Sequence, residues 1–93
     1  MRTRTKARQR AAEALYEAEA RGVSAADVLG RNPDVNDYAA QLAALVESHQ
    51  SRVDEVIQTF ADKWPLHRMP AVDRAILRVA VAEMLFVPDV DTA

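Results

Sequence analysis

The residues of this chain whose type and spacing most directly suggest chemistry lie at its start. The first ten positions hold five of the twelve Lys and Arg residues and no acidic residue. These five are Arg2, Arg4, Lys6, Arg8 and Arg10. The other 83 residues carry 7 basic and 14 acidic groups, so a basic segment precedes an acidic body. Such a split is typical of a segment that binds a polyanion, although a frayed, solvated terminus explains the charges equally well.

Tyr16 is the second candidate for a binding role. Small apolar residues recur around it at helical spacing and predict one buried stripe, formed by Ala7, Ala11, Ala14, Leu15 and Ala18. Tyr16 lies about 150° from the centre of this stripe on a helix of 3.6 residues per turn, so its ring is expected to point outward. An exposed ring near several cations offers a base a stacking surface and its phosphates counter-charges. Packing of Tyr16 on a neighbouring helix is the alternative.

The helix expected to position these residues spans Pro70–Val87. Apolar side chains lie on almost every side of this segment, which indicates the central helix of an all-α bundle. Pro70 suits the first helical position and Pro88 ends the run. Two adjoining apolar stripes, Val72, Ile76, Val79 and Leu77, Ala80, Met84, could not both be covered by one partner helix. The polar residues Asp73, Arg74, Arg78 and Glu83 interrupt the run, so we expect one charged end at the surface.

In the middle of the chain, a regular apolar pattern from Tyr38 to Phe60 predicts helical structure. It fits either one helix of roughly six turns or two helices that meet near Ser48–Ser51, with Asn36 or Asp37 as the N-cap. His49 lies within the apolar face and is expected to be a partly buried packing residue. Trp64 is expected to anchor the core from the linker that follows.

The connection between the first helix and this middle segment has a clear sequence signature. Gly22 is expected to end the first helix in a left-handed conformation, and Ser24 to cap a short helix over residues 25–29. A loop is expected over residues 31–35.

Composition excludes several kinds of site. The chain has no Cys, and its two His residues cannot form a zinc site alone. It contains no phosphate-binding glycine loop and no nucleophile elbow, so we expect no cofactor, no metal and no catalytic residues. No apolar run approaches the roughly 20 residues that span a bilayer, and no signal core follows the Arg-rich start. These features predict a single cytoplasmic domain that is not an enzyme.

Four segments together resemble a known family. The Arg-rich opening runs into AAEALY at residues 11–16, and GVS follows at Gly22–Ser24. The longest match is WPLHRMPAVDRAILR at Trp64–Arg78, followed by EML at Glu83–Leu85. In this order they resemble the NusB family of transcription antitermination factors, and the residues of these segments are most similar to those of its actinobacterial members. The resemblance covers essentially all 93 residues.

The resemblance implies an RNA-binding domain over residues 1–93, with an N-terminal subdomain at about 1–50 and part of a second at about 51–93. Members of the family bind boxA RNA of ribosomal operon leaders together with NusE, a small-subunit ribosomal protein, within the antitermination complex of RNA polymerase. The family's Arg-rich helix falls on the five cations named above, its RNA-contacting tyrosine on Tyr16, and its acidic residue at the start of the central helix on Asp73. The resemblance places Asp73 in both the RNA-binding and the partner-binding surface, and we expect Arg74 and Arg78 to contact the protein partner.

The resemblance also implies that this chain is shorter than other members of the family, and it leaves two alternative functions open. Family members continue past the position of Ala93 into about two more helices, so we expect part of the apolar surface of Pro70–Val87 to be exposed or covered by another chain, including a second copy. A NusB-like targeting domain of an RNA cytosine methyltransferase is one alternative function. A helical protein-interaction module, with the basic segment serving only solubility, is another.

Overall fold

The computed structural model describes residues 2–31 and 37–88, and the part it describes is helical without any strand. The helices are α1 (Arg2–Arg21), α2 (Ala25–Gly30), α3 (Asp37–Ser48), α4 (Gln50–Phe60) and α5 (Ala71–Phe86), with one 3₁₀ turn, η1 (Leu66–Arg68), before α5. The all-α prediction is confirmed. Asn36, and the predicted loop beyond Arg31, lie outside the described residues.

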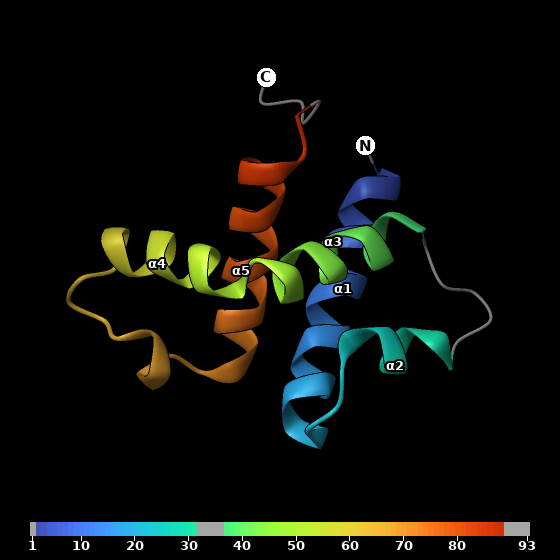
Figure 1. The fold of residues 1–93 in the computed structure, drawn as a ribbon, viewed down its shortest axis with the longest axis horizontal. Coiled ribbons are helices and arrows are strands. Elements are labelled where there is room, and N and C mark those ends of the chain that lie inside the picture. The colour runs from blue at the N-terminus through green and yellow to red at the C-terminus, as the bar shows by residue number, and fades with distance from the viewer. Residues whose placement is uncertain (1, 32–36, 89–93) are drawn as a thin grey trace.

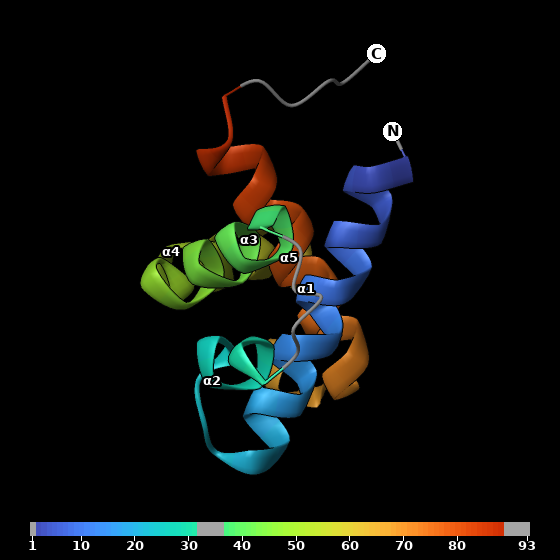
Figure 2. The same cartoon turned by 90° about the vertical axis from the view of Figure 1, so that its right-hand side faces the viewer.

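Helices α1 and α5 form an antiparallel pair, and the other helices lie on one side of it. α1 and α5 run in opposite directions side by side, while α3 and α4 follow one another across the pair with α2 next to α3 (Figures 1 and 2). Figure 2 shows that no described helix covers the opposite side of the pair. The pair therefore has one face in the core and one open face.

Small residues form the buried face of α1. The predicted stripe is confirmed for its alanines Ala7, Ala11, Ala14 and Ala18, which are all buried, while Leu15 is partly buried. Gly22 has a φ of 70°, the left-handed conformation that the sequence predicts at this helix end, and the Val23 N–H donates to the Ala18 carbonyl at 3.0 Å.

Two further local predictions hold. The Ser24 hydroxyl accepts the Asp27 N–H as the cap of α2. The middle segment is two helices that meet at His49, rather than one continuous helix.

Two single-residue predictions are wrong. His49 is exposed rather than partly buried, although its ring stacks on Phe86 with centroids 4.1 Å apart. Trp64 is about half exposed and does not anchor the core. Met69, five residues later, is buried in its place, because the chain turns inward through η1 before α5 begins.

The burial of α5 reverses part of the prediction from its apolar pattern. The helix does contact α1, α3 and α4, as a central helix should. Its buried residues, however, are Ala75, Val79, Ala82 and Glu83, while Val72, Ile76 and Leu77 are exposed and Met84 is 75% exposed. Two of the four buried residues are alanines, whereas the larger apolar side chains Val72, Ile76 and Met84 line the groove on the open face of the pair.

Candidate nucleic-acid interface

The basic segment forms the first half of α1. It is helical from Arg2, and Ala7 and Ala11 are buried beneath it. The Arg2 side chain lies outside the described residues. Lys6 is exposed, and the Arg10 guanidinium lies 3.9 Å from the exposed Glu13 carboxylate. Lys6 and Arg10 are thus solvent-facing cations on an ordered helix.

Arg8 is bound to a buried acid that the sequence analysis did not assign to the site. The Arg8 Nε donates to Glu83 Oε1 at 2.7 Å, and the Tyr38 hydroxyl donates to Glu83 Oε2 at 2.6 Å. Glu83 is only 5% exposed, whereas the Arg8 side chain is 38% exposed. The Arg4 guanidinium lies over the Tyr38 ring, 4.7 Å from its centroid. We call these four residues, Arg4, Arg8, Tyr38 and Glu83, the α1 clamp.

The surroundings of the α1 clamp shift three pKa values. Burial acts to raise the pKa of Glu83, but the hydrogen bonds from Arg8 and Tyr38 together outweigh it and the pKa lies below its usual value. The hydrogen bond to Glu83 raises the pKa of Arg8. Burial, followed by the bond to Glu83, raises the pKa of Tyr38. Glu83 is therefore held as a carboxylate that accepts from two neighbours.

Tyr16 points outward, as predicted, and is 46% exposed. Its ring lines an open groove of about 680 Å³ between α1 and α5. Gln9 and Ala12 lie on the α1 side of the groove, and Val72, Ile76 and Met84 on the α5 side. The exposed ring of Tyr16 is therefore bordered by apolar side chains, and the groove begins at the turn of α5 that carries Asp73.

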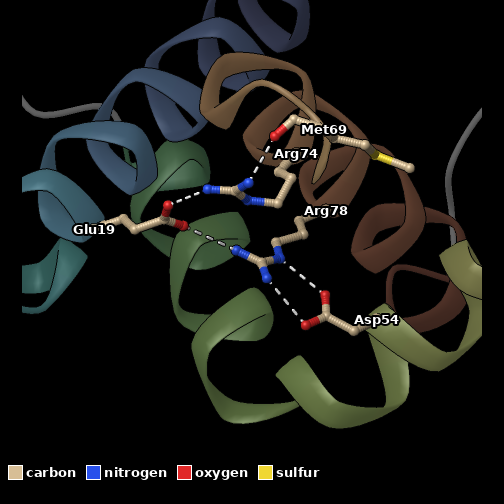
Figure 3. Close-up of polar contacts among 5 residues, drawn as sticks. All are labelled: Glu19, Asp54, Met69, Arg74 and Arg78. Atoms are coloured by element: carbon tan, nitrogen blue, oxygen red, sulfur yellow. Dashed lines mark hydrogen bonds and ion pairs between the residues drawn. The ribbon is translucent and has the colours of Figure 1, made fainter. Parts of the chain in front are cut away.

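Arg74 and Arg78 lie in a second charged cluster, which we call the α5 brace (Figure 3). Arg78 donates to both carboxylate oxygens of Asp54, at 2.8 and 3.0 Å, and to Glu19 at 3.3 Å. Arg74 donates to the Met69 carbonyl at 2.7 Å and to the other oxygen of Glu19. The brace joins the end of α1, the start of α5 and α4.

Asp73 is exposed in the first turn of α5 and takes no part in the brace. The described residues contain no group of His, Asp and Glu able to hold a metal ion. Among the described helices, none is long and apolar enough to cross a membrane.

Comparison with known proteins decides the family. Residues 5–93 match the family model described as the NusB family. The chain belongs to the NusB family. A relative from Thermobifida fusca is 47% identical over 93 residues, covering 95% of this chain and 66% of the relative. A relative from Kineococcus radiotolerans is 47% identical over 95 residues, covering 97% and 70%. One from Nocardioides is 42% identical over 98 residues, covering 100% and 73%.

These relatives confirm the resemblance to actinobacterial NusB proteins and the expectation of a protein that is not an enzyme. Each of the three is named transcription antitermination protein NusB. The chain spans about two thirds of the length of these curated relatives. The two-subdomain division and the roles of the individual site residues stay predictions.

Sequence reasoning missed the two inner members of the α1 clamp. Glu83 is the one acid in the second half of an apolar helix, and a lone acid at such a position signals a buried partner. Tyr38 lies in an apolar stripe and gave no signal of its own beyond a hydroxyl that needs a partner when buried.

Proposed function

We propose that this protein is a transcription antitermination factor that binds boxA-type RNA of ribosomal RNA operons in the bacterial cytoplasm. The observation that carries the proposal is an ordered basic helix with an outward tyrosine, in a chain whose relatives are named antitermination proteins. The methyltransferase-targeting alternative has no comparable support, because the three relatives are named for antitermination.

The proposed RNA surface is the solvent-facing side of α1. Lys6 and Arg10 supply exposed positive charge, and Tyr16 lies six residues after Arg10, about 9 Å along the helix axis. One strand of RNA running along α1 would meet phosphate-binding cations first and a stacking surface second. Aromatic stacking of this kind is worth about 1–3 kcal/mol per base. Arg2, Arg4 and Arg8 complete the proposed set.

The proposed surface for NusE is the start of α5. Asp73 is the exposed acid there, and the apolar side chains of Val72 and Ile76 lie beside it on the open face. Arg74 and Arg78 remain members of this proposed surface, but their bonds to Glu19 and Asp54 favour a supporting role. The same open face is the proposed contact for a second copy of the chain, since exposed apolar side chains favour association.

The test is a titration of labelled boxA-type RNA, with and without NusE, against a scrambled RNA of equal length. We expect tighter binding of the boxA-type RNA and a further gain when NusE is present. Lys6→Ala and Arg10→Ala should weaken binding to both RNAs and flatten the salt dependence by roughly 0.7 log unit per lost phosphate contact. Equal affinity for the two RNAs would contradict the proposed function. An unchanged salt slope would remove α1 from the binding surface.

A further inference from the structure

Arg8 differs from the other described cations of α1 in how it is held. Its Nε is fixed by a buried carboxylate at 2.7 Å, yet its side chain is 38% exposed. The two terminal nitrogens of Arg8 bond to no residue in the described part of the chain. Arg8 is therefore fixed at its inner edge and open at its outer edge.

Both carboxylate oxygens of Glu83 accept a hydrogen bond, which stabilises this arrangement. One of its oxygens accepts from Arg8 and the other from the Tyr38 hydroxyl at 2.6 Å. Because Glu83 is 5% exposed, loss of either bond would leave a buried acceptor with fewer partners. Tyr38 and Glu83 thus hold one orientation of the Arg8 guanidinium.

Tyr38 also acts on a second cation. The Arg4 guanidinium lies 4.7 Å from the centroid of its ring, and Arg4 precedes Arg8 by one turn, about 6 Å along α1. A planar guanidinium whose position is already fixed binds a phosphate through parallel N–H donors with less loss of side-chain freedom. Immobilising a flexible side chain on binding costs about 0.5–1.5 kcal/mol, and the α1 clamp has already met that cost for Arg8.

The charge of Glu83 makes the expected effect distinctive. Glu83 offsets the positive charge of Arg8, so the pair adds little to the long-range attraction that governs sequence-independent binding. The pair instead fixes the direction in which the Arg8 donors point. Phosphate contacts with fixed direction set the register of a nucleic acid on a protein, and register decides which base reaches a stacking residue such as Tyr16.

We propose that Glu83 and Tyr38 are positioning residues of the RNA surface, which aim Arg8, with Arg4 one turn before it, at the phosphates of the bound RNA and so fix its register on α1. The proposal rests on the proposed function. It predicts that the α1 clamp controls discrimination between RNA sequences, whereas the exposed cations Lys6 and Arg10 control affinity for any RNA.

The experiment measures the affinity of the full chain for boxA-type and scrambled RNA, together with the melting temperature of each variant. Glu83→Gln keeps the size of the side chain and removes its charge. We expect a loss of about 2- to 12-fold for boxA-type RNA, from the immobilisation cost of one side chain. Binding of scrambled RNA should stay the same or tighten, because the surface gains one net positive charge. A structural role alone would lower the melting temperature and leave the ratio of the two affinities unchanged.

Two further variants keep the test decisive if Glu83→Gln folds poorly. Arg8→Lys keeps the charge but lacks the second edge of the guanidinium, and it should lower the affinity ratio as Glu83→Gln does. Tyr38→Phe keeps the ring under Arg4, loses the hydroxyl, and should cause a smaller loss. Arg21→Lys is the matched control, because Arg21 lies on α1 but bonds only to the exposed Glu17 at 3.0 Å among the described residues.

The outcomes separate the two claims. If the parent protein prefers boxA-type RNA and the variants keep its affinity ratio, the positioning role is wrong and the proposed function stands. If the parent does not distinguish the two RNAs, the proposed function fails and the positioning role fails with it. A reduced ratio in Glu83→Gln and Arg8→Lys, with the parent ratio in Arg21→Lys, supports the positioning role.

Discussion

The α1–α5 pair carries an arginine–carboxylate cluster at each end, and the two clusters are arranged in opposite ways. In the α1 clamp the acid, Glu83, is buried on α5 and the cation, Arg8, reaches it from α1 through one nitrogen. In the α5 brace the cations lie on α5, where the Arg78 side chain is 14% exposed, and Glu19 reaches them from α1. Arg78 bonds to carboxylates through three nitrogens.

We interpret this difference as a division of roles: a guanidinium surrounded by acceptors supports the packing of helices, whereas one with open donors is able to bind a ligand. Arg78 has two carboxylates and little free donor capacity, so its bonds stabilise the packing of α1 and α4 on α5. Among the described residues Arg8 contacts one carboxylate, which also accepts from Tyr38, and its two terminal nitrogens bond to none of them. Both arginines belong to the predicted site, yet the contacts favour a ligand role only for Arg8.

The largest expected effect is loss of stability when the brace is broken. Arg78→Ala removes three hydrogen bonds and leaves Asp54, whose side chain is 25% exposed, without its partner. We expect the free energy of unfolding to fall by about 1–3 kcal/mol. Arg52→Ala is the control, because Arg52 pairs with Glu55 on an exposed surface and such pairs contribute at most about 0.5 kcal/mol. Urea unfolding of both variants measures the difference. Equal losses would mean that the brace is an ordinary surface pair.

A second prediction concerns Tyr16, which lies on α1 between the two clusters. Tyr16→Ala should cost about 1–3 kcal/mol of RNA affinity if a base stacks on the ring. The thermal stability should change little, because the side chain is half exposed and its removal leaves no closed cavity. RNA titration and thermal melting of the same samples test both statements. A large loss of stability with RNA affinity retained would make Tyr16 a packing residue.

Acid should affect the clamp through Glu83. The folded state lowers the pKa of Glu83, with the Arg8 and Tyr38 hydrogen bonds outweighing burial, so it binds this proton less readily than the unfolded chain does. The resulting stability is complete above the ordinary glutamate pKa of about 4.3 and is lost as the pH falls through the lower folded value. Glu83→Gln should therefore lose less stability than the parent between about pH 5 and pH 3. Urea unfolding across this range measures it, and identical acid dependence in the two proteins would contradict the assignment.

The sequence predicted the helices better than the faces they bury. Local rules that need no tertiary information predict the end of α1 at Gly22 and the start of α2 at Ser24. They also predict the buried alanines of α1. They do not predict the exposed face of α5, because hydropathy ranks Ile76 and Met84 as core residues while the folded chain buries Ala75 and Ala82 instead. Which face of α5 is buried depends on where α1, α3 and α4 pack against it, which periodicity does not encode.

The candidate site shows the same division. The charge count indicated the basic face of α1, and helical geometry indicated the direction of Tyr16. Glu83 and Tyr38 lie 75 and 30 positions after Arg8 in the sequence, so only the folded chain reveals that they meet. Their contact depends on the antiparallel packing of α1 on α5 and on α3 crossing the pair (Figure 1).

The smallest expected effect belongs to Asp73, which lies next to Arg74 but outside the brace. Asp73→Asn keeps the size of the side chain and its acceptor oxygen while removing the charge. In the first turn of α5 that charge interacts with the helix macrodipole, so its removal should cost about 0.3–1 kcal/mol at low salt and less at high salt, where the interaction is screened. Asp62→Asn is the control, because Asp62 is also exposed but lies in a turn after α4. Melting temperatures at low and high salt distinguish a macrodipole interaction from a specific bond of Asp73. A loss that salt does not reduce would mean that Asp73 makes a specific bond within the fold, and it would count against Asp73 as a residue kept free for a partner.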